Sequence, residues 1–238
     1  MDPFDVDCSS VSTFSLYAVE AAKEYVDLME SQISQSHAAM RSAAIKKSAG
    51  VDEEEYDIHV RPVEEAFDEH RQILRYTEVV YLCILLETYL KRHFTQIQEL
   101  RNRKPDNLEK WKEQKNFNCG LVEAAQKYFQ DDAKWSIFTL DEWEALREIS
   151  AVRNCIVHAA GIARDHGLKG REDIKALEER TWRKKPVGVE IEKVDGRDFG
   201  RPIIIHKQFP QYIIHLLDKL FKALEVKTHA EFLGKAKL

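Results

Sequence analysis

The stretch Val79-Val80-Tyr81-Leu82-Cys83-Ile84-Leu85-Leu86 is hydrophobic at every position. A helix with no polar side is covered by neighbouring elements on several sides, so this run marks the centre of the fold. Upstream, Pro62 suits a first helical turn, and the following Glu64-Glu65 face the positive end of the helix dipole favourably. We therefore expect a central helix from Pro62 to about Leu100, ended by Arg101-Asn102-Arg103-Lys104-Pro105.

Hydrophobic residues at helical spacing predict further helices on both sides of this one. The N-terminal helix is expected to fade in a Ser/Ala-rich run near residues 31–50, and Asp52-Glu53-Glu54-Glu55 is interpreted as an exposed acidic turn rather than a mimic of nucleic-acid phosphates. Beyond Leu100, Gly120 interrupts a second helical stretch before residues 122–129. The residues that predict the N-terminal helix are Phe14, Tyr17, Ala18, Ala21, Tyr25, Leu28 and Met29.

The next helix has clear signals at both of its ends. Thr139-Leu140-Asp141-Glu142 is a capping box, and Gly161 is a natural stop. A small β-hairpin at about residues 187–206 and a C-terminal helix follow. The hydrophobic stripe of the capped helix comprises Leu146, Ile149, Val152 and Ile156, and that of the C-terminal helix comprises Tyr212, Ile213, Leu216, Leu217, Leu220 and Leu224.

These patterns predict a mainly α fold, a helical bundle with one small hairpin near the C-terminus. We expect residues 1–60 to form an acidic helical extension, and residues 61–238 to form the main domain with the hairpin as an insertion. Residues 1–60 hold 12 acidic and 4 basic side chains, whereas the whole chain has a net charge of -5, so the main domain is mildly basic. The charge neither requires nor excludes nucleic acid as a partner.

The composition is that of a soluble, helix-rich globular protein: of 238 residues, 44% are hydrophobic and 32% charged. There is no hydrophobic run of membrane-spanning length, and Met1-Asp2-Pro3-Phe4-Asp5 is acidic where a signal peptide is basic. A cytoplasmic protein without membrane contact is expected. The four cysteines form no C-x-x-C pair, so we expect free thiols, no zinc site and no cofactor.

The best candidate for chemistry is Arg153-Asn154-Cys155-Ile156-Val157-His158, at the end of the capped helix. On an ideal helix Asn154 and His158 share a face opposite the hydrophobic stripe, whereas Arg153 lies on the flank of that stripe. A buried arginine needs an acceptor, for which Glu87 on the central helix is a candidate. One interpretation is structural, with an Arg153–Glu87 ion pair and an exposed His158 at a helix end.

The other interpretation is catalytic. A histidine can take a proton from a ribose 2'-hydroxyl or give one to the leaving 5'-oxygen, and an arginine can stabilise the charge on the phosphoryl oxygens. This chemistry cleaves RNA without a metal. Because this helix supplies only one histidine, a second His158 from a symmetry-related copy would complete a two-proton mechanism.

Leu146-Arg147-Glu148-Ile149 leading into Arg153-Asn154-Cys155-Ile156-Val157-His158 and Gly161 resembles the R-x4-6-H signature of HEPN domains, in its R-N-x-x-x-H form. The resemblance covers roughly residues 62–225. It implies a helical bundle that forms a homodimer with two motifs facing each other, with Arg153 and His158 as the catalytic pair, Asn154 in support and Glu87 as an acidic residue on the preceding helix.

Many HEPN proteins are metal-independent endoribonucleases that act as toxins or in antiviral defence, so an antitoxin or inhibitor protein is a candidate partner. The alternative is a non-catalytic HEPN module that binds RNA, nucleotide or a partner protein.

Three other groups of residues are alternative candidates for a site. Arg180-Thr181-Trp182-Arg183-Lys184-Lys185 combines four bases with an indole, which suits RNA binding, although a solvated loop has the same composition. Asp165-His166 lacks further metal ligands at recognisable spacing. His206 and His215 flank hydrophobic positions and are interpreted as structural.

Overall fold

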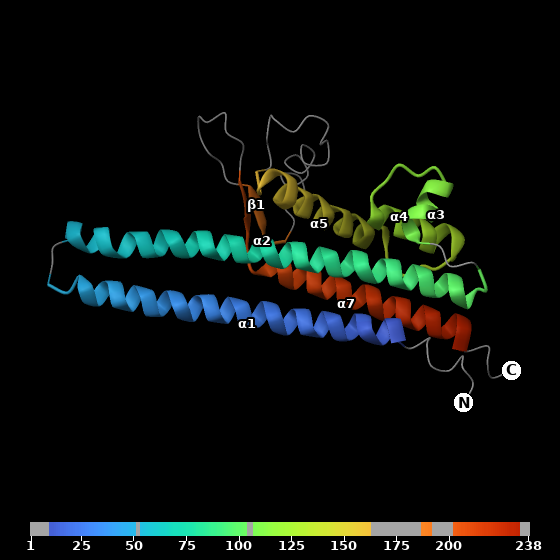
Figure 1. Ribbon diagram of the computed structural model, residues 1–238, viewed down its shortest axis with the longest axis horizontal. Coiled ribbons are helices and arrows are strands. Elements are labelled where there is room, and N and C mark those ends of the chain that lie inside the picture. The colour runs from blue at the N-terminus through green and yellow to red at the C-terminus, as the bar shows by residue number, and fades with distance from the viewer. Residues whose placement is uncertain (1–9, 51–52, 104–106, 163–186, 192–201, 234–238) are drawn as a thin grey trace.

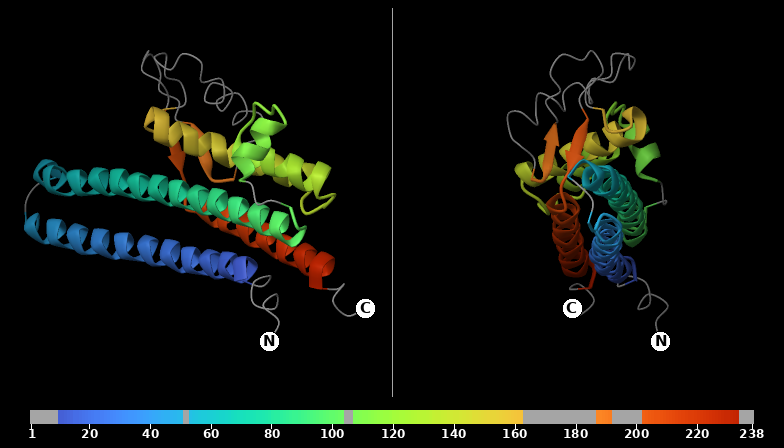
Figure 2. Two further views of the ribbon diagram at one scale, coloured as in Figure 1. Left: turned by 45° about the vertical axis from the view of Figure 1, so that its right-hand side comes forward. Right: turned by 90° about the vertical axis from the view of Figure 1, so that its left-hand side faces the viewer.

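The computed structural model describes residues 10–50, 53–103, 107–162, 187–191 and 202–233. Two long helices, α1 (Ser10–Lys47) and α2 (Glu53–Leu100), form an antiparallel pair. Helix α7 (Gln208–Thr228) lies along this pair, and α5 (Leu140–Ala159) lies on the side of α2 away from α1 (Figures 1 and 2). The predicted mainly α fold with a small hairpin near the C-terminus is confirmed.

Short elements complete the fold around these long helices. Helix α3 (Leu108–Gln114), helix α4 (Leu121–Lys127) and the π-helix η1 (Tyr128–Asp132) lie between α2 and α5, and a second π-helix, η2 (His229–Leu233), follows α7. Gly120 is the N-cap of α4, which confirms the predicted interruption. Within the described ranges, no helix combines the length and hydrophobicity that a membrane span requires.

Helices α1 and α2 are longer than the sequence patterns predicted. Helix α1 does not fade after residue 31 but continues to Lys47, and the chain turns at residues 48–50. The predicted acidic turn is also wrong at Glu53, where α2 already begins, nine residues before Pro62. Pro62 lies inside α2, because the long contact with α1 stabilises a helix that local preference alone would start at the proline.

The hairpin consists of β1 (Val189–Ile191) and β2 (Ile203–Ile205), which pair antiparallel with Val189 opposite Ile205. Its predicted strands are confirmed, whereas the predicted turn at Asp195-Gly196 lies outside the described residues. Side chains of α2 fix the hairpin. The Tyr76 hydroxyl donates to the carbonyl of Ile203 at 2.6 Å, and the Gln72 amide exchanges two hydrogen bonds with the backbone of Ile205.

Helix α5 begins and ends as predicted. Thr139 and Glu142 form the capping box, and the helix ends at Ala160 and Gly161, whose φ angles are 49° and 78°. The backbone amide of Gly161 donates to the carbonyl of Cys155 at 3.1 Å, and the carbonyl of Gly161 accepts from Ile203 at 2.7 Å. The last turn of α5 is thus held between its own C-cap and the hairpin.

The central helix is less completely covered than expected. Val79, Leu82 and Leu86 are buried in the common core, but Tyr81 and Ile84 are 40% and 51% exposed. Helices α1, α5 and α7 cover α2 on several sides and leave these two residues on an open side.

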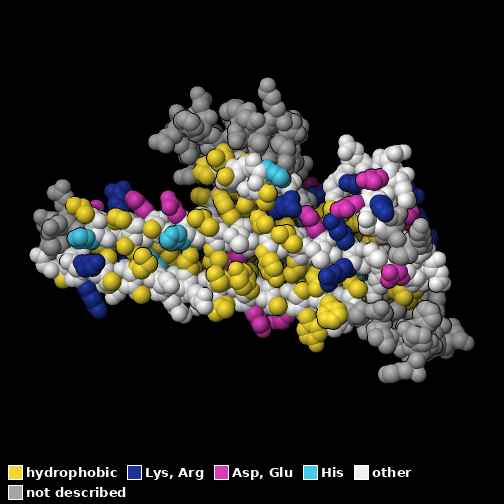
Figure 3. Space-filling model, viewed as in Figure 1, with side chains coloured by type: hydrophobic (Ala, Val, Ile, Leu, Met, Phe, Trp, Pro, Cys, Tyr) yellow, Lys and Arg dark blue, Asp and Glu magenta, His cyan; other side chains and the backbone are white. Residues whose placement is uncertain are grey.

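The hydrophobic stripe of α1 is also open to solvent. Its large side chains are exposed, whereas the smaller Val19, Ala22 and Val26 pack into the core and allow α1 to approach its neighbours closely. The exposed hydrophobic residues of α1 and those of α2 are together called the exposed hydrophobic face. Figure 3 shows hydrophobic side chains gathered over the middle of α1 and α2. The face comprises Phe14, Tyr17, Tyr25 and Leu28 of α1 with Tyr81 and Ile84 of α2.

Candidate functional site

A groove of about 300 Å³ lies between α2, α4 and α5, and it contains part of the predicted motif. Its size is at the lower end of the range of small-ligand pockets. Helix α5 forms one wall, the start of α4 forms the opposite wall, and α2 contributes Cys83 and Glu87. The residues that line it are Cys83, Glu87, Gly120, Leu121, Val122, Glu123, Arg147, Ser150, Ala151, Arg153 and Asn154.

Arg153 is held from two sides in this groove. Its Nη2 lies 3.6 Å from Glu87 Oε1, which confirms the predicted ion pair, and its Nη1 donates to Asn154 Oδ1 at 2.9 Å. The Arg153 and Glu87 side chains are 25% and 33% exposed, so both reach solvent. Arg153 Nε is buried and has no hydrogen-bond partner among the described residues.

His158 lies outside the groove. It is exposed in the last turn of α5, about 6 Å further along the helix axis than Asn154, and it is not among the groove-lining residues. No hydrogen bond or ion pair joins it to another residue in the described part of the chain. The fold therefore brings Arg153, Asn154 and Glu87 together and places the exposed His158 side chain outside this group.

Arg147 is a second cation in the groove, and the sequence patterns gave it no role. Its Nη1 donates to Gln126 Oε1 of α4 at 2.5 Å. A signal was present in the sequence, because Arg147 lies 7 residues before Asn154 and 11 before His158, so the three share one face of an ideal helix.

Cys83 lies on the floor of the groove but is poorly suited to act as a nucleophile. Burial raises the pKa of its thiol to about 12, although the nearby Arg153 guanidinium lowers it. The thiol is therefore protonated near neutral pH. Cys83, Cys119 and Cys155 form no disulfide bond among the described residues, and Cys8 lies outside them.

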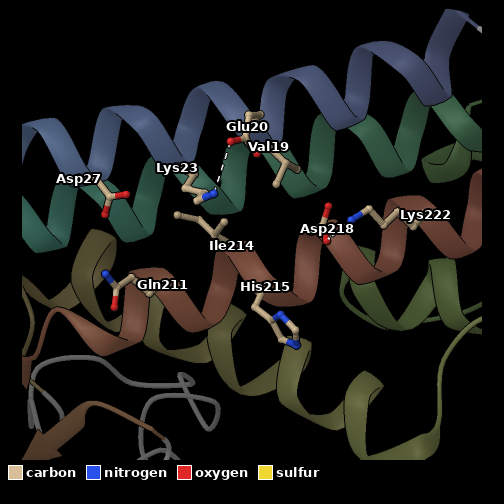
Figure 4. A pocket seen from close by; sticks show the side chains of 9 residues that line it. All are labelled: Val19, Glu20, Lys23, Asp27, Gln211, Ile214, His215, Asp218 and Lys222. Carbon is tan, nitrogen blue, oxygen red and sulfur yellow. Dashed lines mark hydrogen bonds and ion pairs between the residues drawn. The ribbon is translucent and has the colours of Figure 1, made fainter.

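A larger groove, of about 450 Å³, lies between α1 and α7 (Figure 4). Its lysines are engaged on their own helices: Lys23 is 3.4 Å from Glu20, and Lys222 is 2.7 Å from Asp218. His215, which was interpreted as structural, is exposed and lines this groove. Acidic and basic side chains alternate along this groove and do not gather around one position where a charged ligand group could bind.

Ser15 and His93 form a buried hydroxyl–imidazole contact, with 3.3 Å between Ser15 Oγ and His93 Nε2. Burial lowers the pKa of His93 to about 4, so the ring is neutral. Both residues are fully buried and neither lines a groove, so we interpret the pair as packing.

The remaining predicted residues that the structure describes do not line the groove. Nε2 of His206 lies 3.5 Å from Glu190 within the hairpin, in agreement with a structural role. The basic segment Arg180–Lys185, with Trp182, and the pair Asp165-His166 lie outside the described residues. Within the described ranges, no set of three or more His, Cys, Asp or Glu side chains could hold a metal ion.

The groove on α5 is therefore the place where the predicted residues, two guanidinium groups and a solvent-accessible hollow coincide. Comparison with known proteins adds no assignment: no protein family, no curated protein and no solved structure matches the chain.

Proposed function

We propose that this protein is a metal-independent endoribonuclease of the HEPN kind, with Arg153, Asn154 and His158 as its catalytic residues. The observation that carries the proposal is the arrangement of Arg153, which Glu87 and Asn154 hold in an open groove about 1.4 helical turns from the exposed His158. The resemblance of the R-N-x-x-x-H motif to the HEPN signature supports the same assignment. A cytoplasmic toxin or antiviral defence effector is the biological role that goes with it.

In the proposed reaction the imidazole of one His158 accepts the proton of a ribose 2'-hydroxyl. The 2'-oxygen attacks the adjacent phosphorus, and the bond from phosphorus to the 5'-oxygen breaks. The leaving oxygen takes a proton from an acid, for which the His158 of a second copy is suited, and the products are a 2',3'-cyclic phosphate and a 5'-hydroxyl. Arg153 stabilises the phosphoryl oxygens as negative charge develops on them.

The exposed hydrophobic face supports a second copy of the chain as partner. Ile84 of this face is three residues from Glu87, so the two lie on one side of α2 next to the groove. Large hydrophobic surfaces of this kind mark interaction sites. We propose that a homodimer covers the face and brings two α5 helices together, and that an inhibitor protein is the competing occupant.

The test is RNA cleavage by the purified protein in EDTA, with the product ends identified. Wild type is expected to yield cyclic phosphate ends, and His158→Ala to reduce the rate by roughly 10²- to 10⁴-fold through loss of acid–base catalysis. His215→Ala is the matched control, because His215 is exposed on α7 away from the α5 groove. Activity that survives in His158→Ala, or that EDTA abolishes, would refute this mechanism.

One observation favours the alternative of a non-catalytic module: within a single chain His158 lies outside the groove that holds Arg153. Such a module would bind RNA, nucleotide or a partner protein through the groove without cleaving RNA. The two functions separate in the same experiment. A protein that binds RNA through Arg153 but leaves it intact, as a dimer and at every pH tested, is a binding module.

A further inference from the structure

The positive charge of Arg147 is not neutralised within the groove. Its hydrogen bond goes to the neutral amide of Gln126, and none of the ion pairs among the described residues involves it. The other charges of the groove are paired. Glu87 lies against Arg153, and Glu123 lies 3.1 Å from Lys127. The groove is lined by two arginines and two glutamates, and Arg147 is the one of these four residues that has no oppositely charged partner among the described residues.

The Gln126 contact also fixes where this charge lies. Gln126 is 8% exposed, and its own amide nitrogen donates to Gln130 at 3.3 Å, so the acceptor that holds Arg147 is itself held. One Nη atom of Arg147 is occupied, and the rest of the guanidinium fork can bind an anion in two contacts. The groove therefore has an oriented donor for a group such as phosphate.

Arg147 is too far along α5 to act on the phosphate that His158 would cleave. With a rise of about 1.5 Å per residue, Arg147 precedes Asn154 by about 10 Å and His158 by about 16 Å along the helix axis. That distance exceeds one phosphate-to-phosphate step of a nucleic-acid strand. Arg147 and His158 nevertheless share one helix face, so a strand that lies along α5 can meet both.

We propose that Arg147 binds a backbone phosphodiester of the same RNA strand, more than one phosphate step away from the cleaved one, and that Gln126 is its positioning residue. The proposal rests on the proposed function for the identity of the strand. It defines a binding subsite at the α4 end of the groove, separate from the catalytic residues. Its effect is on substrate affinity and register, so loss of Arg147 raises KM and leaves kcat for bound substrate unchanged.

The test measures binding of a single-stranded DNA oligonucleotide without terminal phosphates, which 2'-hydroxyl chemistry cannot cleave. Arg147→Gln is expected to weaken binding about tenfold at low salt and to reduce the slope of log K against log salt by about 1, since one phosphate contact is lost. Arg147→Lys should recover part of the affinity, because it keeps the charge and loses the fork. Thermal unfolding of each variant shows whether it is folded.

Arg61→Gln is the matched control. Arg61 is a 72%-exposed arginine in an ion pair with Glu65, and it lies 26 residues, or about 39 Å, along α2 from Glu87. Equal affinities and slopes for wild type, Arg61→Gln and a folded Arg147→Gln would overturn the proposal. So would a dependence on Arg147 that is confined to a nucleoside 5'-monophosphate, because the groove would then recognise a terminal phosphate.

The DNA measurement keeps this inference separate from the catalytic one. If the protein cleaves no RNA but Arg147→Gln still lowers DNA affinity and the salt slope, the catalytic proposal fails and the subsite stands. If RNA is cleaved and Arg147→Gln changes neither DNA binding nor KM, the subsite fails and the catalytic proposal stands.

Discussion

The charged side chain of Arg153 is half-buried, and two neighbouring side chains, Asn154 and Glu87, stabilise it there. Asn154 accepts one hydrogen bond at 2.9 Å, whereas Glu87 is 3.6 Å away, beyond ideal hydrogen-bond distance. The pair with Glu87 is therefore loose and solvent-accessible, and a phosphate can compete for the same guanidinium. A tight, fully buried ion pair would instead have made Arg153 a purely structural residue.

Glu78 is a different kind of charged residue, because its carboxyl group is buried and neither oxygen has a hydrogen-bond partner in the described residues. Burial raises its pKa to about 8, with a further increase from Glu30, while Arg75 lowers it and Asp27 raises it slightly. The native state therefore keeps a proton that the unfolded state loses above about pH 4.5. The unfolded state binds fewer protons over this range, so stability falls as pH rises from about 4.5 to about 8.

We predict that this residue lowers the free energy of unfolding by about 3 kcal/mol between pH 4.5 and pH 7, and that Glu78→Gln removes that part of the pH dependence. Urea unfolding at several pH values between 5 and 8 measures it. Glu24→Gln, on the exposed side of α1, is the control and should keep the wild-type slope. An unchanged slope in Glu78→Gln would show that Glu78 is ionised in the native state.

At the scale of elements, the sequence predicted best where the signals are local. The start and end of α5 follow from Thr139, Glu142 and Gly161, which act within one turn of the helix, and all were confirmed. Which side of α1 is buried depends on the neighbours that it meets, so the large residues of its stripe were misleading. The start of α2 was missed because packing outweighs the preference of Pro62.

The candidate site follows the same division between local and long-range information. The pairing of Arg153 with Glu87 could be predicted, since both residues are polar groups at the edges of hydrophobic stripes. Arg147 was missed because its importance comes from α4, whose Gln126 and Gly120 form the other side of the groove. The spacing of residues within α5 does not reveal that α4 lies opposite Arg147.

The C-terminal end of α5 gives a prediction at this scale. Gly161 has a φ of 78°, and a side chain there would collide with the ring and hydroxyl of Tyr76 on α2. Gly161→Ala should therefore lower the stability by about 2 kcal/mol or more, through both backbone strain and the collision. Gly50→Ala is a matched control, because Gly50 has a φ of 92° and open space around it.

Thermal or urea unfolding of the two variants separates the causes. The Gly50 variant reports strain alone, so the additional loss in Gly161→Ala measures the contact between α5 and α2. Tyr76→Phe should recover part of that additional loss, since it removes the hydroxyl nearest to the new methyl group. Equal losses at Gly50 and Gly161 would mean that α5 does not depend on close contact with Tyr76.

At the scale of the whole molecule, the incomplete cover of α2 belongs to a larger surface that includes the hydrophobic stripe of α1. Both the stripe of α1 and the all-hydrophobic run of α2 have the composition of buried elements, and both are open on the same side. The rings of Tyr25 and Tyr81 meet there at a centroid distance of 5.9 Å and join the two helices into one continuous surface. A second copy of the chain would bury this surface and place another α5 near the first.

This arrangement predicts that Ile84→Glu converts a dimer into a monomer, because it places a charge in the middle of the exposed hydrophobic face. Sedimentation equilibrium measures the change, and Ile58→Glu is the control: Ile58 is 62% exposed, comparable to Ile84 at 51%, but lies on α2 far from that face.

RNA cleavage should fall when the dimer dissociates. Mixing wild type with His158→Ala then tests whether the site is shared, because a mixed dimer holds only one of the two His158 side chains that the mechanism uses. Activity should fall below the fraction of wild-type chains only if each site uses both chains. A monomeric wild type, or a monomeric Ile84→Glu with full activity, would contradict the shared site.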